Sequence, residues 1–271
     1  MSHMQRRNFL GLSAAAAGGL ALGKRLEGAV AGARAAPARK APGAAAGKRT
    51  VVVWAEGTAP PNVYPKEING AIAEGLKTAL AGWDVVVAGI SDPDQGLPDG
   101  LLAKTDVLMW WGHKKHKDVS DALVEKIVKR VKDEGMGFIA LHSSHFAKPN
   151  KALMGTACSW GAYKGDSTTC TIRVKDAKHP IAEGLPAEFT FEHSERYTEP
   201  YAVPEPKAVP LEGFHTVRDG SKDPARMGLC WEIGKGKFFY FMPGHETNPV
   251  FVDGNVRRIM GNAVKWAAPA K

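Results

Sequence analysis

The sequence predicts an α/β domain with a doubly wound, mostly parallel sheet and helices on both of its faces. Short β-branched and apolar runs alternate with helical patterns along residues 50–141, and the runs lack a polar face, as strands covered on both sides do. This rhythm stops near residue 150 and returns near residue 227. Residues 150–225 are therefore expected to be an irregular excursion over the carboxyl edge of the sheet.

Local sequence patterns predict the strands and helices of the regular part of the chain. Apolar residues recur at helical spacing at Ile68, Ile72 and Leu76, which indicates an amphipathic helix. Asp118 or Ser120 is expected to cap the second helix. The expected strands are 50–55, 83–90, 106–111, 138–141, 227–233 and 238–241. The expected helices are 66–81, 119–132 and 253–267.

Turn-forming residues mark the remaining stretches. The four prolines between Glu199 and Pro210 exclude a helix there, and Gly-Lys-Gly at 234–236 is expected to be a turn between the last two strands. The expected loops are 56–65 and 92–100. Within the excursion, the stretches with the pattern of short strands are 168–174 and 189–191.

The N-terminus has the pattern of a twin-arginine export signal. Arg6 and Arg7 precede a short apolar stretch, 13–22, and small residues that fit a cleavage site lie around 31–38. The apolar stretch is too short and glycine-rich to span a bilayer. We therefore expect a periplasmic or extracellular mature protein without a membrane span. The expected organisation is an export signal (1–36), a disordered linker (37–49) and one α/β domain (50–268).

The formal net charge of +8 belongs to this N-terminal segment. Residues 1–50 hold nine Lys and Arg and one acidic residue, whereas the rest of the chain holds 27 of each kind. A neutral domain does not predict nucleic-acid binding, and no nucleotide cofactor is expected. Cys158, Cys170 and Cys230 are too few for a disulfide framework and leave room for at most one bridge.

Histidines follow three of the expected strands. His113 and His116 come after 106–111, His142 and His145 come after 138–141, and His245 follows the last strand. The ligand crevice of an open parallel sheet lies beyond the carboxyl ends of its strands. We therefore expect these imidazoles to converge at one edge of the sheet.

Imidazoles from three strand ends predict a site for a divalent metal, zinc or manganese. We expect His113, His142 and His245 to be the ligands. His116 and His145 each lie three residues beyond one of them, and are either further ligands or partners that orient the ligands. The alternative is that these histidines are structural and hydrogen-bond the strand ends.

The motifs around the histidines together resemble the trehalose-utilisation (ThuA-like) family. The resemblance spans roughly residues 50–268 and implies a flavodoxin-like fold of the class I glutamine amidotransferase kind. It also implies a role in disaccharide breakdown through 3-keto sugars and, in some members, a bound metal. The motifs are WWGHKKH at 110–116, LHSSHF at 141–146, GTACSW at 155–160, CWEIGKGKFFY at 230–240 and PGHE at 243–246.

The chain departs from the amidotransferases at the position of their catalytic cysteine. That cysteine follows a strand and is partnered by a His and a Glu, whereas here the strand is followed by His142 and Ser143. Thiol catalysis is therefore not expected, although His245 and Glu246 still resemble the partner pair. A serine triad of Ser143 and His245 lacks the glycine-flanked elbow that exposes a nucleophile.

Carboxylate and aromatic side chains complete the expected site. Glu195 is the preferred metal ligand or general base, Glu246 is the alternative for that role, and His145 is a further candidate to move the proton. The tandem tryptophans 110 and 111 are expected in the core. The residues expected to bind sugar are Trp160, Tyr163, His116 and Glu199.

Together with the export signal, the resemblance implies an exported enzyme that cleaves a 3-keto disaccharide or glycoside by metal-assisted elimination or hydrolysis. A keto group acidifies the neighbouring C–H, so that a base can remove this proton and expel the glycosidic oxygen. The alternative is a non-catalytic carbohydrate-binding or interaction domain of the same fold, and a third hypothesis is amide or ester hydrolysis at Ser143. A homo-oligomer is compatible with the sequence.

Overall fold

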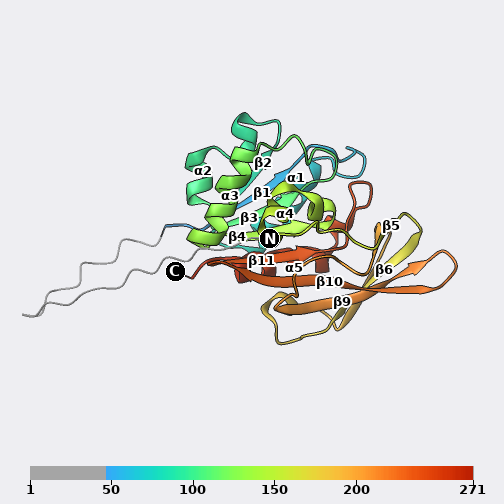
Figure 1. The fold of residues 1–271 in the computed structure, drawn as a ribbon. Helices are drawn as coiled ribbons and strands as arrows, with labels where there is room; N and C mark the ends of the chain where they lie inside the picture. The colour runs from blue at the N-terminus through green and yellow to red at the C-terminus, as the bar shows by residue number, and fades with distance from the viewer. Residues whose placement is uncertain (1–46, 271) are drawn as a thin grey trace, which may run out of the picture. The chain divides into compact units, whose positions relative to one another are not determined.

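The computed structural model describes residues 47–270 (Figure 1). The predicted export signal, 1–36, and residues 37–46 of the predicted linker lie outside the described residues. The strands are β1 Thr50–Ala55, β2 Asp84–Gly89, β3 Val107–Trp111, β4 Gly137–Leu141, β5 Ala162–Lys164, β6 Ser167–Val174, β7 Glu188–Glu192, β8 Arg196–Thr198, β9 Ala208–Val217, β10 Lys222–Ile233 and β11 Gly236–Phe241. The α-helices are α1 Glu67–Ala79, α2 Asp99–Lys104, α3 Asp121–Glu134, α4 Lys148–Met154 and α5 Gly254–Ala267. Short 3₁₀ segments are Pro93–Gly96, His142–Phe146, Pro180–Ala182 and Val250–Val252.

Nine strands form one mixed sheet in the order β2-β1-β3-β4-β11-β10-β9-β6-β7, and β5 pairs with β8 separately. The strands from β2 to β11 in this order run parallel to their neighbours. From β11 onward the pairs are antiparallel. The predicted doubly wound α/β class is therefore confirmed, with a parallel core that continues into an antiparallel half.

The parallel core is built from strands without a polar face. Every residue of β1, β3 and β4 is buried, which is the pattern of strands covered on both sides. Trp110 and Trp111 are fully buried, as predicted, and the ring of Trp110 stacks on that of Trp54 with centroids 3.6 Å apart. These aromatic rings supply much of the apolar area in the core.

Two helix groups cover this sheet. Helix α1 packs against α5, and α3 packs against α4, with no substantial contact between the two groups among the described residues. Of the two predicted caps of α3, Ser120 is the one that accepts a hydrogen bond, from the amide of Leu123 at 3.2 Å. The helix ends at Gly135 in the left-handed conformation, which glycine adopts without strain.

The excursion differs from the sequence expectation because it is regular over most of its length. Strands β6, β7 and β9 extend the main sheet, and β10 begins at Lys222 rather than near residue 227. The stretches 168–174 and 189–191, expected to be short strands, are confirmed as β6 and β7, whereas β5, β8 and β9 were missed. Partners in this half of the sheet lie far apart in sequence, so a local pattern could not show the pairing. Helices α2 and α4 were also missed, since six and seven residues are too few to show a period. The proline-rich stretch contains no helix, as predicted.

The topology brings three strand ends into one row. Trp111 of β3 pairs with Leu141 of β4, and Leu141 pairs with Phe241 of β11. The residues that follow these three strands therefore meet at one edge, as predicted. Within residues 47–270, the helices are all too short or too polar to cross a bilayer.

Candidate functional site

The segments after β3, β4 and β11 deliver one histidine each to the shared edge. His142 adopts a left-handed backbone conformation with a φ of 47°, and His245 has a φ of 153°. Residues other than glycine rarely adopt a positive φ. A Cβ atom on Gly244 would lie 2.6 Å from the Cβ of His142, so glycine is needed for this close approach. Unusual backbone of this kind clusters at functional sites.

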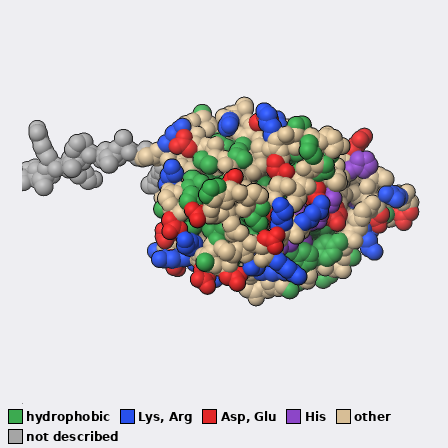
Figure 2. Space-filling model, turned by 90° about the horizontal axis from the view of Figure 1, so that it is seen from above, with side chains coloured by type: hydrophobic (Ala, Val, Ile, Leu, Met, Phe, Trp, Pro, Cys, Tyr) green, Lys and Arg blue, Asp and Glu red, His purple; other side chains and the backbone are tan. Residues whose placement is uncertain are grey.

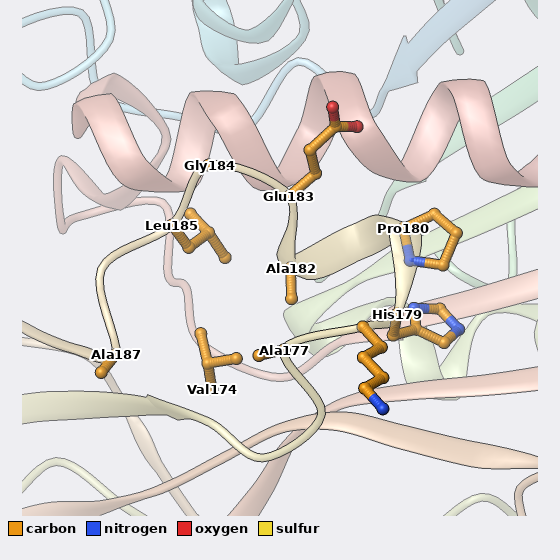
Figure 3. A pocket seen from close by; sticks show the side chains of 10 residues that line it. Val174, Ala177, His179, Pro180, Ala182, Glu183, Gly184, Leu185 and Ala187 are labelled. Carbon is orange, nitrogen blue, oxygen red and sulfur yellow. The ribbon is translucent and has the colours of Figure 1, made fainter.

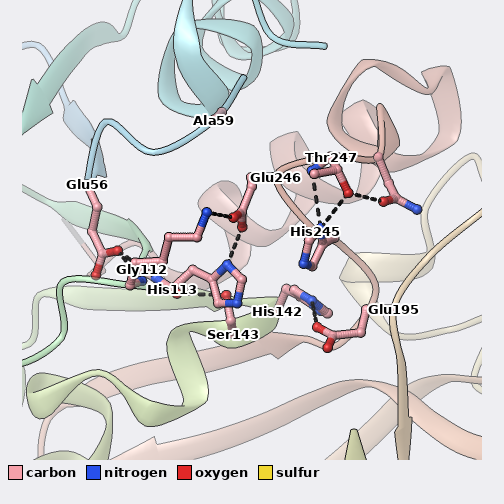
Figure 4. A network of polar contacts seen from close by, with 12 residues as sticks. Glu56, Ala59, Gly112, His113, His142, Ser143, Glu195, His245, Glu246 and Thr247 are labelled. Carbon is pink, nitrogen blue, oxygen red and sulfur yellow. Dashed lines mark hydrogen bonds and ion pairs between the residues drawn. The ribbon is translucent and has the colours of Figure 1, made fainter. Parts of the chain in front are cut away.

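His113, His245 and Glu246 form a compact cluster at this edge (Figure 4). One donor atom from each side chain lies within 4.8 Å of the other two. His113 Nδ1 hydrogen-bonds Glu246 Oε2, and Lys114 Nζ lies 2.6 Å from Glu246 Oε1. Two imidazoles and a carboxylate are the ligand set of many catalytic zinc sites.

The protonation states of the cluster suit a cation. Burial alone opposes ionisation of Glu246, but the contacts with His113 and Lys114 prevail and lower the pKa of its carboxyl to about 2. Burial lowers the pKa of His245, which keeps its imidazole neutral. The hydrogen bond to Glu246 raises the pKa of His113, so a proton competes with a metal ion there.

His142 lies beside this cluster and uses both of its ring nitrogens. Nδ1 is 2.7 Å from the carbonyl oxygen of Met242, and Nε2 is 3.0 Å from both Glu195 Oε2 and the hydroxyl of Tyr197. The Tyr197 ring stacks on the imidazole with centroids 4.4 Å apart. The structure thus groups Glu246, and not the predicted His142, with His113 and His245.

Glu195 is held against the same edge from the excursion. Its amide donates to the carbonyl oxygen of Gly244, 3.3 Å away, and Ser194 Oγ accepts from the Gly244 amide at 3.0 Å. Burial opposes ionisation of Glu195, but contact with His142 outweighs it and lowers the pKa of Glu195 to about 2. Glu195 is therefore a carboxylate that accepts hydrogen bonds at neutral pH.

A pocket of about 380 Å³ opens next to Glu195 and His245. Its wall is rich in hydroxyl, amide and charged groups, which suits a polyhydroxylated molecule better than an apolar one. Histidine side chains reach the molecular surface among Lys, Arg, Asp and Glu in Figure 2. The pocket is lined by Gly165, Ser167, Thr168, His193, Ser194, Glu195, Arg218, His245, Thr247, Asn248 and Pro249.

The sequence model for the ThuA family, described as trehalose utilisation, matches residues 51–267. The chain belongs to the ThuA family. No curated protein matches it in sequence. The membership accounts for the motifs around the histidines, and it leaves the reaction open.

Solved structures share the fold of this ThuA-family chain. A ThuA-like protein from Parabacteroides merdae is 12% identical, with a TM-score of 0.62 over 83% of this chain and 92% of its own. A ThuA-like protein from Bacteroides uniformis is 18% identical, with a TM-score of 0.55 over 83% and 94%. A cytoplasmic protein from Salmonella typhimurium is 14% identical, with a TM-score of 0.56 over 81% and 99%. At these identities the similarity shows the fold alone.

The residues predicted to bind sugar lie outside the polar pocket of this ThuA-family chain. Trp160 is only 4% exposed and stacks on Tyr201, and Glu199 pairs with Arg226. Tyr163 is 37% exposed, so its ring remains accessible to a ligand. His116, the fourth residue, lies in the loop after β3, where its Nδ1 is 3.6 Å from Glu56 Oε1.

His145 and Ser143 are both tied to the backbone. His145 is fully buried, its Nδ1 lies 2.6 Å from the carbonyl oxygen of Cys158, and burial lowers its pKa to about 3. Ser143 donates its hydroxyl proton to the carbonyl oxygen of Gly112 at 2.8 Å, and no hydrogen bond joins it to His245 among the described residues. The three cysteines are buried and free.

Sequence reasoning missed Tyr197 and Glu56. Tyr197 follows Glu195 by two residues and hydrogen-bonds His142, but its motif alone gave no sign of this contact. Glu56 directly follows the buried strand β1, the same signal that selected the histidines. Since 56–65 was interpreted only as a loop, that signal was overlooked.

A further pocket lies away from these residues. It measures about 680 Å³ and is lined by the segment from Val174 to Ala187, with His179 and Glu183 on its wall (Figure 3). His179 accepts a hydrogen bond from the Ile181 amide at 3.2 Å, so it caps a turn. This pocket contains none of the predicted site residues and no comparable group of donors.

Proposed function

We propose that this ThuA-family protein is an exported enzyme that cleaves the glycosidic bond of a 3-keto sugar with the help of a divalent cation. The observation that carries the proposal is the cluster of His113, His245 and Glu246 beside Glu195 and the polar pocket. The twin-arginine pattern of Arg6 and Arg7 supports export to the periplasm or beyond.

The residues present fit a divalent cation. A neutral His245, an ionised Glu246 and a His113 that can lose its proton are the ligand forms that zinc or manganese requires. Three protein ligands leave coordination positions open for a substrate. The chemistry that a bound divalent cation supplies is electrostatic stabilisation of negative charge on the ketone oxygen.

The proton transfers fall to Glu195. Its carboxylate takes the proton from the carbon between the ketone and the anomeric carbon, and the C–H electron pair forms an enolate. Collapse of the enolate breaks the bond between the anomeric carbon and the glycosidic oxygen. Protonated Glu195 then returns the proton to that oxygen, which gives an enone and a free alcohol, and addition of water to the enone completes a net hydrolysis.

The neighbours of Glu195 hold its carboxylate in position for proton transfer. His142 and Tyr197 contact one another and His142 contacts the carboxylate, while Gly244 fixes the Glu195 backbone. The hydroxyl and amide groups of the pocket can hydrogen-bond the hydroxyls of a sugar. Both features favour a carbohydrate substrate over an apolar one.

The alternative is a non-catalytic carbohydrate-binding domain, and one observation favours it. Both carboxylate oxygens of Glu246 already have cationic or imidazole partners in Lys114 and His113, so the cluster is satisfied by protein groups alone. In that reading the pocket binds a sugar without turnover.

Metal analysis and turnover separate the two proposals. The mature protein, purified without chelator or nickel resin, is expected to hold one zinc or manganese ion and to consume 3-keto disaccharides. His245→Ala should remove the metal, and Glu195→Gln should keep the metal but lose turnover by about a hundredfold or more. His179→Ala, in the remote pocket, is the control. Sugar binding without metal or turnover would establish the binding domain instead.

A further inference from the structure

Glu56 lies directly after β1 and faces the loop that carries His113. Its carboxylate is fully buried, and Oε2 accepts hydrogen bonds from three successive backbone amides, those of His113, Lys114 and Lys115, at 2.8, 2.7 and 2.9 Å. Lys115 Nζ also donates to the Glu56 carbonyl oxygen at 3.2 Å. Three amide bonds to one carboxylate oxygen fix the path of the loop.

Gly112 allows the carboxylate to approach the loop so closely. A Cβ atom at this position would lie 2.9 Å from Glu56 Oε1, and 3.2 Å from both His116 Nδ1 and Trp110 Nε1. These three polar atoms therefore close over the Cα of Gly112, and any side chain would push them away. The φ of Gly112 lies outside the left-handed region. Glycine is therefore required here by the lack of space for a Cβ atom and not by the backbone conformation.

The held loop leads directly to the cation cluster. His113 Nδ1 and Lys114 Nζ both contact the carboxylate of Glu246, and their backbone amides are two of the three that Glu56 holds (Figure 4). We propose that Glu56 is the positioning residue of this site and that it acts by holding the loop so that His113 meets Glu246. This inference rests on the proposed cation site and adds a residue that touches no ligand.

Two variants of the full chain test the role of Glu56. Glu56→Gln keeps the length of the side chain but removes the charge that strengthens the three amide bonds. Gly112→Ala displaces the carboxylate without altering any group of the cluster. Asp106→Asn is the matched control, since Asp106 Oδ2 accepts the Thr50 amide at 2.7 Å at the opposite end of β1 and β3.

The readouts are amide hydrogen exchange of the metal-free protein and zinc affinity by competition with a chelator. In Glu56→Gln and Gly112→Ala, exchange at residues 113–115 is expected to speed up by about tenfold or more, as loss of hydrogen bonds to a charged group implies. Zinc affinity should fall by about tenfold or more, the effect typical of partners that orient metal ligands. Asp106→Asn should change exchange at Thr50 and leave zinc affinity as it was.

Each contrary outcome has its own meaning. Unchanged exchange at residues 113–115 in both variants would overturn the inference, as would faster exchange with unchanged zinc affinity. Failure of the parent protein to bind zinc or manganese would overturn the proposed metal chemistry alone. A crystal structure of Glu56→Gln would then decide the inference, which requires that His113 move away from Glu246 and fails if that contact persists.

Discussion

The backbone of Met242 fixes the orientation of the His142 ring. The carbonyl oxygen of Met242 lies 2.7 Å from His142 Nδ1, and because a carbonyl oxygen can only accept, Nδ1 carries a proton. Nε2 is the nitrogen that faces the site, and it lies 3.0 Å from both Glu195 Oε2 and the Tyr197 hydroxyl. A backbone atom of one strand end thus sets which face of this imidazole serves the site.

Two substitutions of His142 should separate the effect of its contact with Met242 from the effect of its contact with Glu195. His142→Asn can keep a donor near Met242 while the contact with Glu195 is lost, so the fold should survive and turnover of a keto-glycoside should fall about a hundredfold. His142→Ala loses both contacts and should also lower the melting temperature. Thermal unfolding and steady-state kinetics measure the two effects. Equal turnover in His142→Asn and the parent would exclude a catalytic role for the Nε2 contact.

Tyr197→Phe removes one hydroxyl from the same network. The ring and its stacking on His142 remain, but Nε2 loses a hydrogen-bond partner at 3.0 Å in a fully buried position. Loss of such a bond should destabilise the fold by about 1–3 kcal/mol. Urea unfolding measures this, with Tyr163→Phe as the comparison, because Tyr163 is more exposed.

In the proposed cation site, Lys114 is expected to compete with the cation for Glu246. Its side chain is 59% exposed, so the pair contributes modestly, but an ammonium 2.6 Å from Oε1 opposes a second positive charge. Lys114→Met should tighten zinc binding by up to about fivefold, the equivalent of about 1 kcal/mol for an exposed pair. Lys126→Met, which breaks an exposed pair with Asp99, is the control for charge removal. Weaker binding in Lys114→Met would show that the lysine supports the cation.

Acid should weaken the metal-free fold through Glu195 and Glu246. The folded-state pKa of each is about 2, against an ordinary value of 4.5, despite burial that opposes ionisation. Both carboxylates therefore stabilise the fold above about pH 4.5, and this contribution is lost as pH falls toward 2. A double change of both residues to Gln should flatten the dependence of unfolding free energy on pH in that window, whereas Glu125→Gln on exposed helix surface should not.

The tandem tryptophans should dominate the stability of the parallel core. Trp110 is fully buried between β1 and β4 and stacks on Trp54. Trp110→Ala should cost about 3–5 kcal/mol, the usual effect of emptying an aromatic site in a core. Val87→Ala, at a position 47% exposed, should change stability little in the same denaturant titration.

The edge that carries the site could be predicted from the sequence because its causes are local. Runs such as Phe138–Leu141 lack polar residues, which indicates a covered parallel strand, and histidine follows directly. Parallel strands must end at the same edge. The meeting of His113 and His245 follows from that rule, and the structure confirms it.

The side chains that join the cluster could not be predicted, since this depends on the backbone conformation of the loops after the strands. Whether His142 or Glu246 joins the cluster depends on the unusual φ values at His142 and His245, which no residue pattern specifies. Tyr197 reaches His142 only because a long excursion folds back over the edge. Trp160, which was expected to bind sugar, lies instead in a packed aromatic group.

Strand β11 gives the sheet an order of assembly during synthesis. It lies between β4 and β10, yet it follows both of them in the chain. Until residues 236–241 leave the ribosome, β4 and β10 each present an open edge, and the parallel and antiparallel halves have no shared strand. A polypeptide that ends before residue 236 would expose two strand edges with unpaired backbone N–H and C=O groups, which favour aggregation. The strand that joins the two halves of the sheet is thus followed at once by His245 and Glu246, so the sheet becomes continuous only as the last residues of the proposed cation site are synthesised.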